Sequence, residues 1–448
     1  MSRLPTRQSA LAPAWRTMCW PLCLGLGALL AGAGLSALWF LGLPELAAAG
    51  LATALRLAAA WLALGVGLMA AIVALSQLSR QERRAALEEA APEEATPVPG
   101  VTDAVPPPAM RPPEVVAIGG GHGLETLLRG LKLHPCHLTA IVTVADDGGS
   151  SGVLRRDMGM LPPGDVRRCM AALAEAEPLM AQLMEYRFGQ GAGLDGHAFG
   201  NLFLAAMVGI TGGFDSAVAG ANRVLAVRGR VLPASLDDVT LCAEVRARDG
   251  SRGRDGSRLS SLVRGQSQIA KARGIVERVY LEPATAKGHP QAVRALLNAD
   301  LILIGPGSLY TSVVPNLLVP EIREALCASP ALKVYICNVA TQPGETDGYT
   351  MADHVRALRG YMAPGSCDCV LANSNTRVPL AASMIGAMPS ELVQPEGGPL
   401  EGCTVVTADL VDAELPWRHD PHKLAVAVWE LLRAHRPARA GHRDGAGA

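Results

Sequence analysis

Short apolar runs alternate with amphipathic segments from residue 114 to residue 375, and this alternation indicates the class of fold. The apolar runs end in glycine or polar residues; they are 114–121 (EVVAIGGG), 138–149 (LTAIVTVADDGG), 299–308 (ADLILIGPGS), 332–340 (LKVYICNVA) and 367–375 (CDCVLANSN). Buried parallel strands have this continuous apolar character. The segments 124–132, 164–174, 197–210, 213–225 and 350–362 have helical patterns. The alternation predicts an α/β fold with a doubly wound, mostly parallel sheet, which binds ligands beyond the carboxyl ends of its strands.

Two uncharged stretches precede this region, at residues 20–43 and 57–78. Each is long enough to cross a bilayer as a helix, and the connection between them is short. Arginines flank the pair on both outer sides: Arg3, Arg7 and Arg16 before it, and Arg80, Arg83 and Arg84 after it. By the positive-inside rule, residues 1–79 are expected to form a transmembrane hairpin in the cytoplasmic membrane, with both ends and the folded domain in the cytoplasm. The alternatives are a cleaved signal peptide and two buried core helices.

The rest of the chain divides by composition. Residues 80–114 are rich in proline, alanine and glutamate and are expected to form a linker, residues 115–430 the folded domain, and residues 431–448 a disordered basic tail. The 40 basic and 41 acidic residues nearly cancel, which gives no indication of nucleic acid as a partner. The ten cysteines show no C-x-x-C spacing, so reduced thiols in a cytoplasmic domain are expected.

The segment 119–126 (GGGHGLET) joins the first predicted strand to a helix. Glycines allow the backbone N–H groups to approach a phosphate, and the N-terminus of the following helix favours negative charge. The spacing does not fit the dinucleotide fingerprint G-x-G-x-x-G, which makes an NAD dehydrogenase the poorer interpretation. His122 either donates to a phosphate or caps the turn, and a tight structural turn is the alternative for the whole segment.

The second strand ends in 144–157 (VADDGGSSGVLRRD), with two adjacent carboxylates and two serines. Asp146 and Asp147 suit Mg²⁺ or sugar hydroxyls, and in an extended chain they point in different directions. An Asp-Gly turn with a serine cap is the alternative. The nearby arginines at 155, 156, 167 and 168 are candidates for holding an anion or are solvated.

Other strand ends carry similar groups. The segment 304–316 (IGPGSLYTSVVPN) repeats the strand-then-glycine pattern, and 337–349 (CNVATQPGETDGY) places Asn338 and Glu345 after a strand. His197 and Asn201 lie four residues apart on one predicted helix and either read a base or ribose or pack internally. Asp165 is expected to be the N-cap of the helix that starts near it, and Asp215 is expected to cap the predicted helix 213–225. Together these strand ends predict a crevice for a phosphorylated, hydroxyl-rich ligand.

In order along the chain, these segments resemble the gluconeogenesis factor family, which is related to the 2-phospho-L-lactate transferases. The resemblance runs from about residue 115 to 425 and rests on GGGHGL, VTVADDGGSSGVLRRD, LPPGDVRR, DGHAFGNLFLAA, LILIGPGSLYTSVVPNLLVP and NVATQPGETDGY. The chain departs from many members at His122, where threonine is common. It also carries the glycine-, serine- and arginine-rich segment 246–274, which is interpreted as a mobile, solvated insertion.

The resemblance implies a Rossmann-like domain that binds a uridine diphosphate sugar, notably UDP-N-acetylglucosamine. It implies a regulatory role in cell shape and envelope precursor supply during gluconeogenic growth, exerted through a protein partner, and it is compatible with a homo-oligomer. No cofactor is implied. The alternative is a transferase that uses Mg²⁺ at Asp146 or Asp147. The residues implied to contact the ligand are Gly119, Gly120, Gly121, His122, Gly123, Leu124, Asp146, Asp147, Ser150, Ser151, Asn201, Gly305, Pro306, Gly307, Ser308 and Asn338.

Overall fold

The computed structural model describes residues 111–175, 178–191, 193–248, 260–378, 390–396, 400 and 402–440. The predicted transmembrane hairpin (1–79) and nearly all of the predicted linker lie outside these ranges. In the described part of the chain, no single helix has the length and apolar composition needed to cross a membrane. One bent pair passes by length and composition alone, α7 (Phe199–Thr211) with α8 (Phe214–Val224), and its axes differ by 117°.

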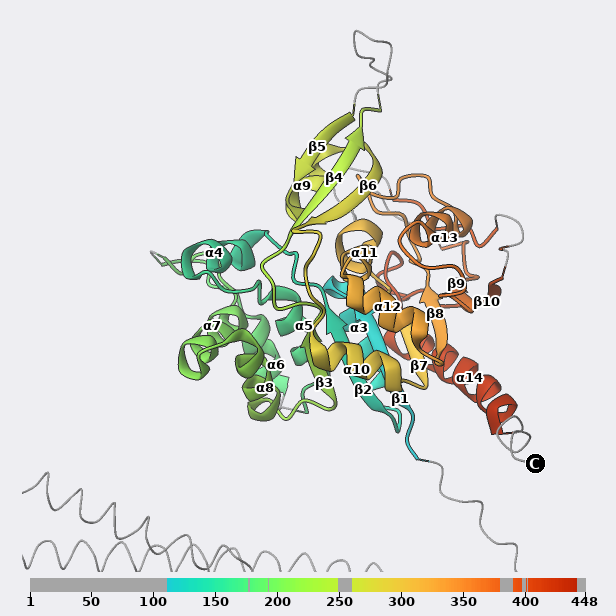
Figure 1. Ribbon diagram of the computed structural model, residues 1–448, viewed down its shortest axis with the longest axis horizontal. Helices are drawn as coiled ribbons and strands as arrows, with labels where there is room; N and C mark the ends of the chain where they lie inside the picture. Colours follow the sequence, from blue (N-terminus) through green and yellow to red (C-terminus); the bar gives the residue numbers. More distant parts are fainter. Residues whose placement is uncertain are drawn as a thin grey trace, which may run out of the picture. The chain divides into compact units, whose positions relative to one another are not determined.

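A seven-stranded parallel sheet forms the centre of the fold (Figure 1). Its strands are β1 (Glu114–Gly119), β2 (His137–Val142), β3 (Arg230–Pro233), β7 (Leu301–Ile304), β8 (Leu332–Ile336), β9 (Cys369–Asn373) and β10 (Thr404–Ala408). The order is β10-β9-β8-β7-β1-β2-β3, and every adjacent pair is parallel. The chain therefore winds away from β1 in one direction and from β7 in the other. The predicted α/β fold with a parallel sheet is confirmed.

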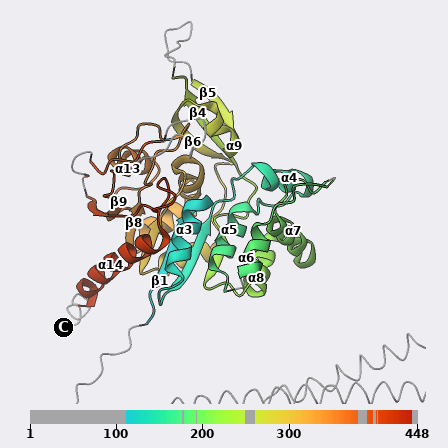
Figure 2. The ribbon, with the colours of Figure 1, turned by 180° about the vertical axis from the view of Figure 1, so that it is seen from behind.

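Helices cover both faces of this sheet. Figure 2 shows α3 (Gly121–Leu131), α5 (Gly164–Leu173) and α14 (Pro421–Ala440) on one face, whereas α10 (Pro290–Asn298) and α12 (Pro320–Ala328) cover the other in Figure 1. Helix α3 buries Leu124, Leu127, Leu128 and Leu131, which recur every three to four residues. Burial of each leucine contributes about 1.5–3 kcal/mol, so this stripe fixes α3 on the sheet.

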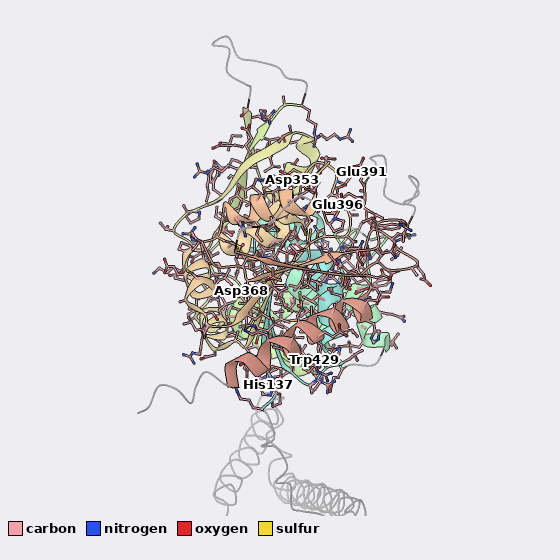
Figure 3. All side chains as sticks on the ribbon, turned by 90° about the vertical axis from the view of Figure 1, so that its right-hand side faces the viewer. His137, Asp353, Asp368, Glu391, Glu396 and Trp429 are labelled. Carbon is pink, nitrogen blue, oxygen red and sulfur yellow. The ribbon has the colours of Figure 1, made fainter. Side chains whose placement is uncertain are left out.

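Helix α14 extends to Ala440, well beyond residue 430, where the sequence predicts that the folded domain ends. Trp429 projects from this helix (Figure 3) and stacks on His134 with ring centroids 5.0 Å apart. Leu432 is buried, and the Arg433 guanidinium lies over the Trp429 ring. These contacts continue the helix past the predicted boundary, so the expectation of a disordered tail from residue 431 is wrong for residues 431–440.

A second, three-stranded antiparallel sheet projects beyond the parallel one, at the top of Figure 1. It consists of β4 (Thr240–Arg246), β5 (Ser260–Arg264) and β6 (Ile275–Glu282), and α9 (Gln266–Ile269) follows β5. The segment 246–274 is therefore not a solvated loop throughout. Its described part contains β5, which pairs with β4, and α9, which buries Ile269. Residues 249–259 lie outside the described ranges.

Further helical elements complete the described part of the fold. They are α4 (Gly149–Met158), α6 (Pro178–Glu185), α8, the π-helical turn Leu309–Val313, α11 (Val314–Leu317) and α13 (Met351–Arg359).

Two predicted helix caps are wrong. Helix α8 begins after Gly213, and Asp215 instead accepts a hydrogen bond from His289 Nε2 at 2.9 Å. Helix α5 begins after Pro163, which leaves Asp165 inside the first turn, where its side chain is buried.

Candidate functional site

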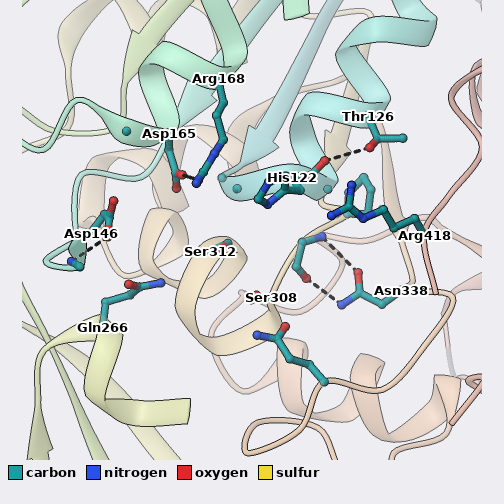
Figure 4. Close-up of a pocket in the computed structure, with 18 of the residues that line it drawn as sticks. His122, Thr126, Asp146, Asp165, Arg168, Gln266, Ser308, Ser312, Asn338 and Arg418 are labelled. Atoms are coloured by element: carbon teal, nitrogen blue, oxygen red, sulfur yellow. Dashed lines mark hydrogen bonds and ion pairs between the residues drawn. The ribbon is translucent and has the colours of Figure 1, made fainter. Parts of the chain in front are cut away.

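A pocket of about 590 Å³ lies at the carboxyl ends of the parallel strands. Its walls come from the segments after β1, β2, β7 and β8, from α5 and α7, from Gln266 of α9, and from residues 417–419 (Figure 4). Strands β1 and β7 are neighbours, and the chain continues from them in opposite directions across the sheet. This is the topological switch point, where doubly wound sheets bind their ligands, and the volume is typical of a small-molecule site.

The first glycine segment forms the start of α3 at the pocket floor. The helix begins at Gly121, which has φ of +63°, so the glycines form its first turn and the predicted start at Leu124 is too late. A Cβ on Gly120 would lie 2.6 Å from the Asp165 carboxylate, and one on Gly123 would lie 2.6 Å from the Pro306 carbonyl oxygen. The Gly121 N–H bonds to the Asp165 carboxylate. The other N–H groups of a first helical turn have no partner within the helix and carry a partial positive charge, which makes this turn a site for an anion.

The second glycine segment, after β7, packs directly on the first. Gly305 and Gly307 both have positive φ, at +79° and +153°. The Asn338 side chain holds Gly307 by two hydrogen bonds. Its Oδ1 accepts from the Gly307 N–H at 3.1 Å, and its Nδ2 donates to the Gly307 carbonyl at 2.8 Å. Asn338 lines the pocket and also fixes the shape of this loop.

The side chains of the two adjacent aspartates point in different directions, as the sequence predicts. Asp146 lines the pocket, and its Oδ1 accepts a hydrogen bond from the Gly148 N–H at 3.0 Å. Asp147 points toward the small sheet, where its Oδ1 accepts from the Ser267 N–H at 2.8 Å. Successive side chains of an extended segment point to opposite sides, which separates the two carboxylates. Asp147 therefore anchors the β5–α9 segment and does not line the pocket.

The pocket is lined by more arginines than aspartates. The arginines are Arg167, Arg168, Arg187 and Arg418, and the aspartates are Asp146 and Asp165. Arg167 is 4% exposed, and its Nη1 donates to the Met184 carbonyl at 3.0 Å. Its Nε has no hydrogen-bond partner among the described residues. Burial lowers the pKa of Arg167 to about 10, which leaves it charged at neutral pH. A buried cation with an unpaired donor suits an anionic ligand.

Asp165 lines the pocket, and its side chain is buried. Burial raises its pKa, and the nearby Asp146 carboxylate raises it further, against the opposing charge of Arg168. Arg168 Nη1 donates to Asp165 Oδ1 at 2.8 Å (Figure 4). Asp165 thus positions Arg168 at the pocket wall. The sequence predicted only an N-cap role for Asp165.

His122 is uncharged at neutral pH. Burial lowers its pKa to about 4, and the positive charges of Arg168, Arg418 and Arg167 lower it as well. A neutral imidazole has one donor nitrogen and one acceptor nitrogen. His122 can therefore hydrogen-bond to a ligand, while the positive charge of the pocket comes from the arginines.

The Ser150 hydroxyl joins α4 to the start of α7. It shares a hydrogen bond with His197 Nδ1 at 3.0 Å and accepts from Asn201 Nδ2 at 3.0 Å and from the Ala198 N–H at 3.4 Å. His197 packs internally and does not line the pocket. Asn201 does, and its buried Oδ1 has no hydrogen-bond partner among the described residues.

The predicted contact residues fall into two groups. The pocket is lined by Gly120, Gly121, His122, Gly123, Asp146, Ser150, Ser151, Asn201, Pro306, Gly307, Ser308 and Asn338. Gly119, Leu124, Asp147 and Gly305 lie beside it. Gly119 and Gly305 belong to the sheet hydrogen bonding of β1, and the Leu124 side chain is in the core.

Several lining residues are absent from the sequence prediction. Trp417, Arg418 and His419 come from the segment before α14, and Gln266, Arg187 and Ser390 come from other distant parts of the chain. Burial lowers the pKa of His419 to about 4, and its Nε2 hydrogen-bonds to the Cys337 carbonyl at 3.2 Å. Within the described ranges, no three His, Cys, Asp or Glu side chains are arranged to hold a metal ion.

The fold and the pocket define a class: α/β proteins with a doubly wound parallel sheet and a ligand crevice at its switch point. Residues 115–411 match the model of the family described as 2-phospho-L-lactate transferase CofD. The chain is 46% identical over 325 residues to the gluconeogenesis factor of Bacillus subtilis, covering 72% of this chain and 98% of that protein. It is 51% identical over 262 residues to the gluconeogenesis factor of Halalkalibacterium halodurans, covering 58% and 78%.

A solved structure gives the same result. The crystal structure of a Bacillus halodurans protein of the UPF0052 family is 43% identical, with a TM-score of 0.64, and the match covers 71% of this chain and 99% of that one. The chain belongs to the CofD/UPF0052 family and, within it, to the gluconeogenesis factors.

Proposed function

We propose that this chain is a regulatory protein that binds a UDP-sugar, with UDP-N-acetylglucosamine as the ligand. The proposal rests on the pocket at the switch point of the sheet, which is lined by two glycine segments and four arginines. A diphosphate has two negative charges and several acceptor oxygens. Helix N-terminal N–H groups and arginine guanidinium groups are the donors that proteins use for such groups.

The rest of the pocket supplies groups for the uridine and the sugar. Asn201 presents an unpaired Oδ1, and Ser308 and Gln342 add a hydroxyl and an amide. Trp417 offers an aromatic ring. Amide and hydroxyl groups recognise sugar hydroxyls and the edge of a base, and an aromatic ring provides a stacking surface. This combination favours a nucleotide sugar over a simple phosphate.

A calorimetric titration tests the proposal. The purified chain is titrated with UDP-N-acetylglucosamine, GDP and NAD, with and without Mg²⁺, and the ligand is recovered for mass spectrometry. A regulatory binding protein is expected to bind the UDP-sugar best, without a metal requirement, and to return it unchanged. Preference for GDP or NAD, or absence of UDP-sugar binding, would reject the assignment.

A pair of arginine variants tests the place of binding. Arg418→Ala removes a charge from the pocket wall, whereas Arg156→Ala removes an exposed charge on α4 outside the pocket. A hydrogen bond to a charged group contributes about 1.5–3 kcal/mol, which corresponds to roughly a 10- to 100-fold increase in Kd for Arg418→Ala. The Kd of Arg156→Ala is expected to stay at the wild-type value. Equal effects would place the ligand outside this pocket.

A Mg²⁺-dependent transferase is the second candidate, favoured by the two carboxylates that face the pocket, Asp146 and Asp165. Mg²⁺ is commonly held by one or two carboxylates together with substrate phosphates, so this donor set fits the ion. Asp146 would hold it with Asp165, since Asp147 is bonded to the β5–α9 segment. A bound Mg²⁺ would neutralise phosphate charge during group transfer. A new product in the Mg²⁺ arm of the titration would establish this function.

We also propose that residues 20–78 anchor the protein in the cytoplasmic membrane. The anchor would hold the domain beside the lipid-linked steps that consume UDP-N-acetylglucosamine, with a protein partner in envelope precursor synthesis, and so support cell shape during gluconeogenic growth. Its basis is the two uncharged stretches and their flanking arginines. A chain lacking residues 1–113, expressed at a matched level, is expected to restore cell shape less well than the full chain. Equal restoration would reject the anchoring role.

A further inference from the structure

Three cysteines gather at the amino ends of β9 and β10, the opposite edge of the sheet from the strand ends that form the pocket. Cys369 begins β9, Cys367 lies two residues before it, and Cys403 lies one residue before β10. The two strands are parallel neighbours, and the Thr404 N–H donates to the Asp368 carbonyl at 2.9 Å. Asp368 marks this region in Figure 3. Strand pairing therefore brings together cysteines that are 36 residues apart in sequence.

The Cys367 and Cys403 sulfur atoms are in contact, with 3.3 Å between them. A disulfide bond has its sulfur atoms about 2 Å apart, so the pair needs little movement to close. The two thiols differ in accessibility: Cys367 is buried, whereas Cys403 is partly exposed. Cys403 is thus the one that a small molecule can reach.

The surroundings favour a thiolate at Cys403. The hydrogen bond from Cys367 and the positive charge of Arg359 lower the pKa of Cys403 to about 7, against burial and the Asp368 carboxylate. The same contact raises the pKa of Cys367, and burial raises that of Cys369 to about 11. A thiolate that is accessible and stands beside a second thiol is the arrangement found in redox-active dithiols.

We propose that Cys403 and Cys367 form a peroxide-reactive dithiol, with Cys403 as the attacking thiol and Cys367 as the resolving thiol. The Cys403 thiolate attacks hydrogen peroxide; a sulfur–oxygen bond forms, the O–O bond breaks, and the hydroxide released takes up a proton to give water. Cys367 then attacks the resulting sulfenic acid; the S–S bond forms, the S–O bond breaks, and the hydroxide leaves as water with the Cys367 proton. Two thiols and one peroxide give one disulfide and two waters.

The disulfide would join the amino ends of β9 and β10 and so enclose β9 together with the connection between the two strands. This connection carries Ser390, which lines the pocket, and Leu392, which bridges to Ala340 after β8. Oxidation would therefore tie the two ends of a segment that contributes to the pocket wall. The inference rests on the cysteine geometry and is independent of the ligand proposed above.

The test treats the reduced full-length chain with hydrogen peroxide and follows intact mass and the cross-linked peptides. The wild type is expected to lose two hydrogen atoms, to show a Cys367–Cys403 link and to regain them with dithiothreitol. Cys367→Ser is expected to stop at a sulfenic acid on Cys403, trapped by dimedone. Cys327→Ser removes an exposed cysteine elsewhere and serves as the control, with wild-type behaviour expected.

A second measurement needs no variant. Iodoacetamide at neutral pH is expected to modify Cys403 in the wild type at least tenfold faster than Cys327. This comparison keeps the test valid if a serine variant does not fold. A peroxide-induced link between other cysteines, or faster alkylation of Cys327 than of Cys403, would overturn the proposal.

Discussion

The contact between the two glycine segments can be tested by adding one methyl group. A Cβ at residue 123 would lie 2.6 Å from the Pro306 carbonyl oxygen, 2.7 Å from its carbon and 2.8 Å from Gly307 Cα. Ordinary contact begins at 3.4 Å, so the second loop would have to withdraw by about 0.8 Å. That loop is held by Asn338 and by the Gly305 N–H, which donates to the Ile118 carbonyl. Because only backbone atoms are in the way, no side chain can simply rotate aside.

The expected cost follows from this geometry. Overpacking costs about 1–3 kcal/mol, whereas replacing a helical glycine by alanine stabilises by up to about 1 kcal/mol. Gly209→Ala in α7 is the matched control, since its Cβ would meet nothing within 4 Å. The free energy of unfolding of Gly123→Ala should therefore lie about 2 kcal/mol below that of Gly209→Ala.

Urea unfolding measures this difference. With an m-value of about 3 kcal/mol/M, the unfolding midpoints of the two variants should differ by about 0.7 M. The affinity for UDP-N-acetylglucosamine should fall for Gly123→Ala and stay unchanged for Gly209→Ala. If both variants unfold at the same or a higher urea concentration than the wild type, the two loops do not touch as described.

Two further predictions concern the residues behind the pocket. Asn338→Ala removes both hydrogen bonds to Gly307 and should lower the free energy of unfolding by about 1–3 kcal/mol and weaken ligand binding; unchanged binding would show that the loop holds its shape without Asn338. Burial raises the pKa of Glu345 from 4.5 to about 7, even though its carboxylate accepts a hydrogen bond from Thr311. The folded state therefore keeps a proton that the unfolded chain releases. The protonated Glu345 carboxyl thus contributes about 3 kcal/mol to the free energy of unfolding. This contribution is fully present below pH 4.5 and is lost as the pH rises through 7. Urea unfolding from pH 4 to pH 8 should show this decline in the wild type and a smaller one in Glu345→Gln, and identical profiles would contradict the raised pKa.

The central strands were predictable because parallel strands buried on both faces are continuous apolar runs. Strands β1, β2, β7, β8 and β9 all follow this rule, and each was expected from the sequence. Strand β10 was not, since it is an edge strand with largely exposed residues, and β3 has only four residues. The small antiparallel sheet was missed for a related reason, since β5 is short and mostly exposed.

The site was predictable where its residues are contiguous in sequence. The glycine segments after β1 and β7 and the polar residues after β2 and β8 follow strands that end at the same edge of the sheet, so they had to meet. Arg418 and Gln266 reach the pocket from segments far away in sequence, and only the tertiary packing brings them there. Asp165 had the sequence context of an N-cap, and its burial beside Asp146 is likewise a result of packing.

A crystal structure of the complex with UDP-N-acetylglucosamine would show where the diphosphate binds. We expect phosphate oxygens within hydrogen-bond distance of the N–H groups at the start of α3 and near Arg168 and Arg418. A second cleft of about 400 Å³ lies beside α8 and β3 and contains Arg223 and Arg230. A ligand bound there, with the pocket between the glycine segments unoccupied, would show that the glycine segments and arginines do not form the UDP-sugar site.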